Sequence, residues 1–224
     1  MATKTMKSEA TKMGRPREFC EEAALDAAMR VFWEKGYEGA SLDDLTTAMG
    51  INRSSLYASL GDKEKLFQKV LERYGSGPMA YMQEALNKQT ARLAIEALLK
   101  DSVKLLSDGT HPRGCLTLQA GLSCGTGAEG AKEAALAYRQ RGLAMLQRRF
   151  QRAAVEGDLP KKVNPKDLAR YVIMLLNGLS VQAVNGASTT ELNRRSRSRV
   201  SPFHVLWSTI NPLPINSRAR AGSM

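Results

Sequence analysis

Few residues of this sequence are suited to covalent or metal chemistry. Its 224 residues include only two histidines and three cysteines. No Cys-x-x-Cys pair or Cys/His cluster has the spacing of a zinc site. A cysteine-dependent enzyme would also need a base, and the sequence offers neither a convincing one nor a glycine-rich phosphate loop nor clustered catalytic carboxylates. We therefore expect no enzyme activity, no metal and no other cofactor.

Long hydrophobic runs are also missing. The longest, Val172 to Leu176, is far shorter than the roughly 20 residues that span a membrane. The N-terminal segment has lysines but no apolar stretch of the kind found in a signal peptide. No alternating pattern long enough for a strand is present, whereas alanine, leucine and arginine are abundant and favour helices. We expect an all-α, cytoplasmic protein that makes no membrane contact and carries reduced cysteines.

The net charge of +11 suggests a nucleic-acid partner, but its distribution does not support this simply. Residues 1–75 carry 12 basic and 12 acidic side chains, so the excess lies in residues 76–224. Near the N-terminus, a basic arm over residues 1–14, followed by Arg15, could track a DNA backbone or enter a minor groove. The alternative is a solvated, disordered arm. The acidic residues of the first 75 are expected in the first two helices, away from any DNA.

The most informative stretch is residues 41–66, which read SLDDLTTAMGINRSSLYASLGDKEKL. Ser41 can cap one short helix, Gly50 can end it in a left-handed turn, and Asn52 can cap the next. Apolar residues spaced by three or four then face inward, and polar residues remain outside. The pattern is typical of a helix-turn-helix, here over about residues 40–59, whose second helix enters a DNA major groove. The alternative is a pair of surface helices in an ordinary bundle.

Polar groups around this second helix are the candidate DNA contacts. We expect its outer face to meet base edges or the backbone through Arg53, Ser54, Ser55 and Tyr57. Ser41 and Lys63 would hold phosphates, since Lys63 stands in the first turn of a further helix whose free amides favour an anion.

These residues and the segment before them resemble the DNA-binding domain of TetR/AcrR-type transcriptional regulators. Residues 14–19, GRPREF, lead into a helix that ends at Gly36-Tyr37, as in that family. The resemblance covers residues 15–75 and departs at Leu60, where the family usually has phenylalanine. Leucine can fill that core position with a modest volume change. The resemblance implies a three-helix head joined by a linking helix to a larger helical bundle.

Beyond the turn residues 75–78, helical periods continue. The expected helices, including the linking helix, cover residues 62–74, 79–87, 90–106, 128–156 and 166–185, with another opening after Pro112. The resemblance implies that residues 76–190 bind an effector and dimerise, and that the last two long helices pair with their twins in a four-helix interface. The alternative for the apolar last helix is ordinary intrachain core.

The effector pocket is expected among the helices of this second domain. Candidate lining residues are Met82, Leu98, Cys115, Leu118, Leu122 and Tyr138. Residues 113–117 resemble a Gly-Cys-Leu motif of one TetR subgroup, in some members of which the cysteine senses electrophiles or oxidants. A helix start after Pro112 and the charge of Arg113 would make Cys115 reactive. A buried structural cysteine is the alternative.

Residues 191–224 read as an atypical basic tail. After Leu192 no acidic residue occurs, prolines prevent a continuous helix, and we expect disorder, with a frameshifted end as one hypothesis. Taken together, the sequence indicates a ligand- or redox-released repressor that binds a palindromic operator as a homodimer. Its partners would be double-stranded DNA, a second copy and an unknown small-molecule effector. The alternative is a cysteine-dependent redox enzyme or a thiol sensor with a non-regulatory role.

Overall fold

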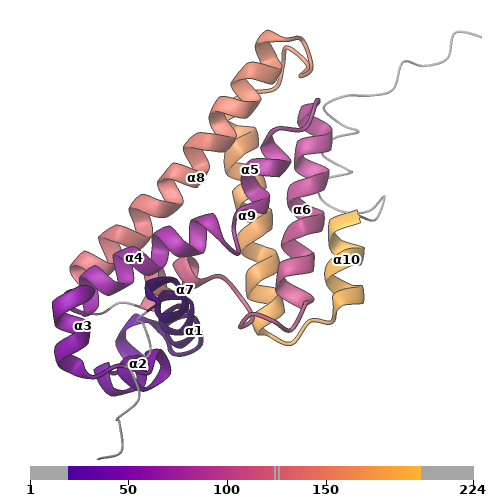
Figure 1. Cartoon of the computed structure of the whole chain (residues 1–224). Coiled ribbons are helices and arrows are strands. Elements are labelled where there is room, and N and C mark those ends of the chain that lie inside the picture. The colour runs from indigo at the N-terminus through magenta and orange to yellow at the C-terminus, as the bar shows by residue number, and fades with distance from the viewer. Residues whose placement is uncertain (1–19, 124, 126, 198–224) are drawn as a thin grey trace, which may run out of the picture.

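The computed structural model describes residues 20–123, 125 and 127–197 (Figure 1). The regular elements of this part are all helices, which confirms the all-α expectation. In chain order they are α1 (Glu21–Gly39), α2 (Leu42–Met49), α3 (Arg53–Ser59), α4 (Lys63–Ser76), α5 (Tyr81–Leu86), α6 (Ala91–Ser107), α7 (Leu116–Ser123), α8 (Glu129–Val155), α9 (Pro165–Val184) and α10 (Thr189–Arg197). Among the described helices, none combines the length and the apolar character needed to cross a membrane.

Local capping explains why the head breaks into short helices. Ser41 begins α2 with a capping box, in which its hydroxyl accepts from the Asp44 amide and the Asp44 carboxylate accepts from the Ser41 amide. Gly50 ends α2 in the left-handed region with φ 67°. The side chain of Asn52 caps α3, and that of Asp62 caps α4. The helix-turn-helix is thus specified by four residues at its ends.

The core of the head is aromatic and does not stop at α4. Phe32 and Phe67 meet edge to face with their centroids 5.1 Å apart, and Leu45, Leu56 and Leu66 around them are fully buried. The same cluster of buried residues includes side chains of α7 and of the first turns of α8. The head, helices α1–α4, therefore packs directly onto α7 and α8, although the turn residues 75–78 suggested a boundary between separate units.

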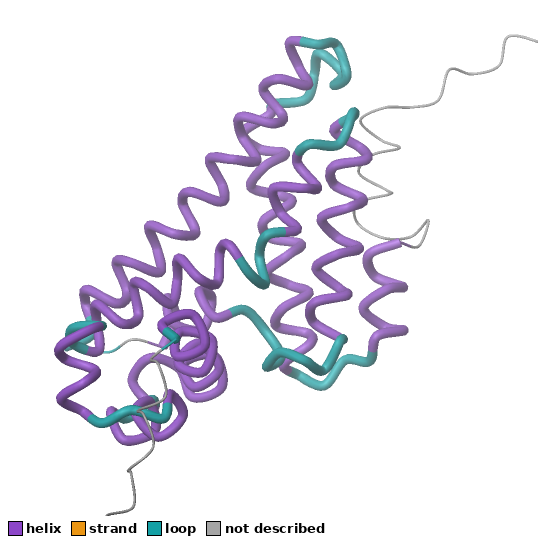
Figure 2. Tube along the Cα trace, in the orientation of Figure 1, coloured by secondary structure: helices purple, strands orange, loops and turns teal. Residues whose placement is uncertain are grey.

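A second core lies at the other end of the molecule. Helices α5, α6, α9, α10 and the C-terminal half of α8 share one cluster of buried side chains, with Ile95, Leu98 and Phe150 fully buried in it. Figures 1 and 2 show α8 running from beside the head to the far tip of this body. Helix α8 contacts α4 and α7 on the side of the head and α5, α6 and α9 in the body, so it connects the two regions.

Two segments differ from the expected outline. Helix α7 begins at Leu116, three residues later than a helix that opens directly after Pro112, so residues 113–115 belong to the preceding loop. Helix α10 extends to residue 197 and buries Leu192 against α6 and α9, because an apolar side chain there completes the body core. The described part of the expected tail is therefore helical over residues 191–197. Residues 198–224 lie outside the described residues.

The left-handed Gly50 makes a prediction about the helix-turn-helix. A Cβ at this position would meet nothing within 4 Å, so a substitution should be penalised only by its backbone conformation. We expect Gly50→Ala to lower the free energy of unfolding by roughly 1 kcal/mol. Gly50→Asn should cost less, because asparagine tolerates this region better. Urea unfolding measures both, and a larger loss for Gly50→Asn than for Gly50→Ala would show that space, not φ, limits this position.

Candidate DNA interface and effector cavity

The outer face of α3 is open to solvent, as a recognition helix requires. The side chains of Ser54, Ser55 and Tyr57 are exposed, and Tyr57 presents 53% of its surface. A side chain this exposed contributes little buried apolar area to the fold, and its surface can contact a partner. The Ser54 hydroxyl donates to the cap residue Asn52 at 2.7 Å and would exchange that bond on contact with DNA.

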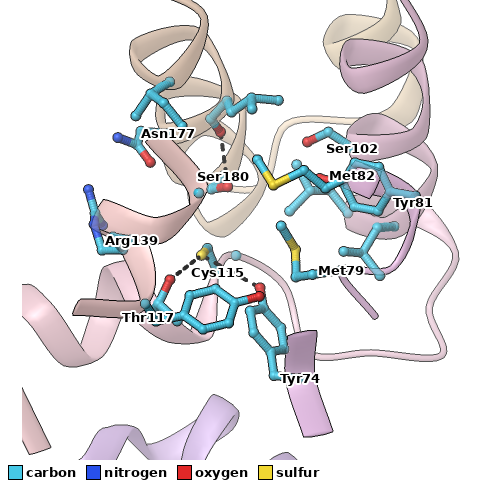
Figure 3. Close-up of a pocket in the computed structure, with 17 residues that line it drawn as sticks. Tyr74, Met79, Tyr81, Met82, Ser102, Cys115, Thr117, Arg139, Asn177 and Ser180 are labelled. Atoms are coloured by element: carbon cyan, nitrogen blue, oxygen red, sulfur yellow. Dashed lines mark hydrogen bonds between the residues drawn. The ribbon is translucent and has the colours of Figure 1, made fainter. Parts of the chain in front are cut away.

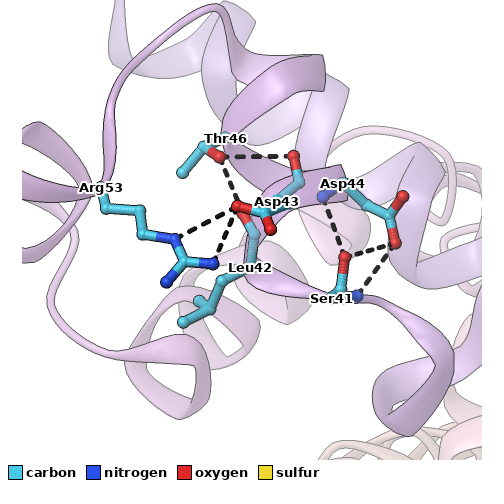
Figure 4. Close-up of polar contacts among 6 residues, drawn as sticks. All are labelled: Ser41, Leu42, Asp43, Asp44, Thr46 and Arg53. Carbon is cyan, nitrogen blue, oxygen red and sulfur yellow. Dashed lines mark hydrogen bonds and ion pairs between the residues drawn. The ribbon is translucent and has the colours of Figure 1, made fainter.

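Arg53 is held by an acidic neighbour (Figure 4). Its Nη2 and Nε lie 2.8 and 3.2 Å from Oδ1 of Asp43 in the first turn of α2. Both side chains are largely exposed, so the ion pair is weak and exchangeable. We expected the acidic residues of the head to lie away from the proposed groove face. Asp43 does not, because the tight turn at Gly50 places the start of α2 next to the start of α3.

Ser41 is occupied in the structure by its capping role. Its hydroxyl donates to the Asp44 carboxylate at 2.7 Å, and the Lys35 ammonium lies 2.6 Å from the same carboxylate. The hydrogen bond from Lys35, followed by those from Ser41, lowers the pKa of Asp44 to about 2. The carboxylate thus stays ionised at neutral pH, and a phosphate near Ser41 would meet this negative charge. The structure thus supports Ser41 first as a cap.

Lys63 opens α4, as expected, and lies half-buried with its Nζ 4.6 Å from the centre of the Tyr37 ring. One backbone amide of this first turn is already used, because Asp62 accepts from the amide of Lys65 at 2.8 Å. Arg15 and the basic arm lie outside the described residues.

A cavity lies where α4, α5, α6, α8 and α9 meet near the start of α7 (Figure 3). Its volume open to the centre of a water molecule is about 80 Å³, where a single water needs about 10–15 Å³, so a small molecule can enter. Three of the expected lining residues are there: Met82, Cys115 and Tyr138.

The other three expected lining residues lie elsewhere. Leu98 is fully buried in the body core, Leu118 is buried outside the cavity wall, and Leu122 is 76% exposed. Their helices were assigned correctly as elements, but the sequence did not indicate which side of each helix faces the cavity. The expectation for these three positions was wrong.

The wall of the cavity is mixed in character and rich in hydroxyl groups. Polar atoms come from Tyr74, Tyr81, Ser102, Thr117, Tyr138, Arg139, Asn177 and Ser180, set among methionine, leucine and isoleucine side chains. Burial raises the pKa of Tyr138 to about 12 and raises the pKa of Tyr74 further above its usual value. The phenols therefore stay protonated, and the Tyr138 hydroxyl can donate a hydrogen bond into the cavity.

Cys115 connects the cavity to the head. The Tyr74 hydroxyl of α4 donates to its Sγ at 3.6 Å, and its Sγ lies 3.3 Å from the Thr117 hydroxyl. Cys115 is half-buried and is not in a disulfide. Its backbone carbonyl accepts from the Gln119 amide at the start of α7. Arg113, expected to activate the thiol, instead donates to the Ala183 carbonyl at 3.4 Å.

A metal at this point has no support in the described residues, where no group of three or more potential ligand side chains gathers. His111 stacks on Trp33 with ring centres 5.5 Å apart. The Trp33 indole N–H in turn donates to the Gly114 carbonyl at 3.3 Å, next to Cys115. The loop before α7 is thereby tied to α1 of the head.

Several functional candidates escaped the sequence analysis. Tyr74 lies in the linking helix expected over residues 62–74, and the hydroxyl that it places on the buried side of this helix is the signal that could have identified it. Gly75 was considered only as a turn residue, yet a Cβ there would lie 3.2 Å from the Tyr138 hydroxyl, so glycine allows α8 to approach α4 closely. No feature of the sequence predicted that Asn177 of α9 would line the cavity.

Two family models match the chain. Residues 24–70 match "Bacterial regulatory proteins, tetR family", and residues 91–198 match "Tetracyclin repressor-like, C-terminal domain". The HTH-type transcriptional repressor ComR of Escherichia coli is 30% identical over 198 residues, which are 86% of this chain and 92% of ComR.

Solved structures agree with these matches. A cysteine mutant of the TetR family transcriptional regulator CifR, in a complex with a 26 bp double-strand operator DNA, is 34% identical and superposes with a TM-score of 0.76 over 89% of this chain and 100% of that one. A putative TetR transcriptional regulator from Rhodococcus sp. RHA1 is 39% identical, with a TM-score of 0.54 over 77% of this chain and 93% of that one.

Proposed function

Because this chain belongs to the TetR family of bacterial regulatory proteins, we propose that it represses transcription as a homodimer that a small molecule releases from a palindromic operator. That it is a DNA-binding transcriptional regulator follows from its family, and a cysteine-dependent enzyme is not favoured, since the relatives are regulators. The observation that carries the proposal is the position of α4, which begins beside the recognition helix and ends with Tyr74 in the cavity wall.

We divide the chain for this purpose into a head over residues 15–75 and an effector-binding and dimerisation domain over residues 76–190, to which α10 is added as far as residue 197. The first family model, over residues 24–70, falls within the head, and the second, over residues 91–198, begins in the other part and ends one residue after α10, which supports the division. The shared aromatic core makes the two parts mechanically one, so that a change in the cavity can move the head.

Dimerisation through α8 and α9 is supported by an apolar face that the single chain leaves open. On α9, Met174 is 61% exposed, Val181 is 44% exposed and Val184 is 53% exposed. Gly178 stands between them on the same side, where it lets another helix approach. Two copies joined here would place two α3 helices on one DNA, as a palindrome requires.

The dimer makes the first functional prediction. Val181→Glu places a charge in the proposed interface, where it would be buried without a partner. We expect this variant to be a monomer by light scattering after size exclusion. Its affinity for an operator selected from random duplexes should fall roughly a hundredfold, because the two heads are no longer linked and lose their avidity. The control Leu93→Glu changes an equally exposed leucine, 46%, on α6 and should leave both unchanged. A Val181→Glu dimer would refute the interface.

DNA binding by a head with balanced charge must rest on a few placed groups. We propose that Arg53, Ser54, Ser55 and Tyr57 meet the groove, that Arg53 exchanges Asp43 for DNA, and that Lys63 holds a phosphate. Ser41 stays in this set chiefly as the cap that positions α2, and Arg15 as a contact of the arm. The proximity of Lys63 to the first turn of α4 supports its role.

Lys63 gives the second functional prediction. Removing one phosphate contact from each protomer of the dimer should weaken binding to specific and random duplexes alike, and should reduce the slope of log K against log salt by about 2. We expect this of Lys63→Gln, measured by fluorescence anisotropy between low and moderate salt. Lys104→Gln, an exposed lysine in the last turn of α6, is the control. A loss of affinity with an unchanged slope would assign Lys63 a structural role.

For the effector we propose a small molecule that enters the cavity and disturbs the Tyr74–Cys115 contact. Its surroundings suit a compact compound with apolar parts and hydrogen-bond acceptors for the phenols. Covalent modification of Cys115 would act in the same way, because any group added to Sγ occupies the space beside Tyr74. The proposal therefore includes release of DNA both by a bound ligand and by oxidation or alkylation of Cys115.

N-ethylmaleimide serves as the probe for this route. In a Cys20→Ser, Cys124→Ser protein only Cys115 remains, and we expect its alkylation to weaken operator binding roughly tenfold or more, the usual range of a coupling free energy. The same protein with Cys115→Ser should be insensitive. Mass spectrometry confirms the adduct, and full operator affinity of the alkylated protein would contradict coupling through Cys115.

A further inference from the structure

A second cavity, which shares no lining residue with the one above, lies between α5 and the C-terminal half of α8. Its volume open to the centre of a water molecule is about 250 Å³. Three arginines line it together with two amides and a methionine: Arg148, Arg149, Arg152, Gln83, Asn87 and Met145. No carboxylate is among its lining residues, so its surface is strongly positive.

Arg149 is the unusual member of this group. Its residue is only 4% exposed, yet its guanidinium uses just one nitrogen in the fold. Nη2 donates to the carbonyls of Lys88 and Gln89, just beyond the end of α5, at 2.9 and 3.3 Å. Within the described structure, Nε and Nη1 are buried and have no hydrogen-bond partner. Leaving charged donors buried and unpaired is costly, and such groups normally have a partner.

The surrounding charges do not supply that partner. Arg152 lies 3.6 Å from Glu156, an exposed and weak pair. Asp158 is engaged by the amide of Ala91 at the start of α6. Burial, followed by the charge of Arg152, lowers the pKa of Arg149, so the site disfavours its own positive charge. An added negative charge would relieve both the repulsion and the unpaired donors.

We propose that this cavity binds a small oxyanion, a carboxylate or phosphate group, between the buried Arg149 and the outer Arg148 and Arg152. The anion's oxygens accept from the unpaired nitrogens of Arg149, whose side chain shifts slightly toward the cavity to reach them. Arginine donors suit both kinds of anion, because their planar N–H groups match the spacing of the oxygens.

The site would add a second input to the regulator, beyond operator binding and the effector cavity. Helix α5 contributes Gln83 and Asn87 to this site, and Tyr81 and Met82 to the effector cavity. An anion that fixes the end of α5 would therefore act on a helix that both sites share.

The test uses the full-length protein with inorganic phosphate and with acetate as probes, by calorimetry and thermal shift at constant ionic strength in chloride. We expect saturable binding of at least one probe, with a rise in Tm. Arg152→Gln should weaken it roughly tenfold, as expected for a hydrogen bond to a charged group. Arg92→Gln is a matched control, since Arg92 also pairs with a glutamate four residues on and is similarly exposed, 49% against 52%. Saturable binding of phosphate but not of acetate would identify the ligand as a phosphate group. Displacement of bound phosphate by acetate would identify it as a carboxylate.

Arg148→Gln gives a second variant that leaves the buried side chain intact, so the result does not depend on replacing Arg149. Binding should survive alkylation of Cys115, which separates this site from the effector cavity. Weak, unsaturable effects of both probes, or equal affinities in wild type, Arg152→Gln and Arg148→Gln, would overturn the proposal without touching operator binding.

Discussion

The contact of Tyr74 with both halves of the molecule is the constraint on which the structure depends. Its ring meets Trp33 edge to face at 5.0 Å in the head, and its hydroxyl reaches Cys115 in the cavity wall. Tyr74 is 1% exposed, so neither contact can be lost without opening the core. Because one residue of α4 contacts both the head and the cavity wall, and closely packed cores have few intermediate arrangements, we expect a displacement at the cavity to reach the head.

Charge near the head reinforces this rigidity more than it attracts DNA. Arg73 of α4 forms two hydrogen bonds of 2.8 Å with Asp26 of α1, and these bonds lower the pKa of Asp26. Arg53 is paired with Asp43 in a similar way. Arg53 of the proposed groove face is thus already in an ion pair, so in our proposal the dimer supplies the affinity that a single head lacks.

A buried charge that is not fully paired lies at the far end of α8. Arg149 holds the end of α5 through two carbonyls while two of its nitrogens stay unsatisfied. The desolvation free energy of such a group must be offset by other interactions for the chain to fold. The effector cavity shows the opposite pattern, since the Tyr74 hydroxyl and the Cys115 thiol in its wall already have partners within the chain. The two cavities therefore suit different ligands, one compact and partly apolar, the other anionic.

The sequence by itself determined the helices, their caps and the helix-turn-helix, because each of these depends on residues within about four positions of one another. Ser41, Gly50, Asn52 and the apolar periods were sufficient for that. Only the tertiary structure decided which faces meet: it placed Leu98 in a core and Leu122 in solvent, paired Arg53 with Asp43, and left Arg149 buried with unsatisfied donors. These outcomes depend on how whole helices rotate and approach, which local spacing does not encode.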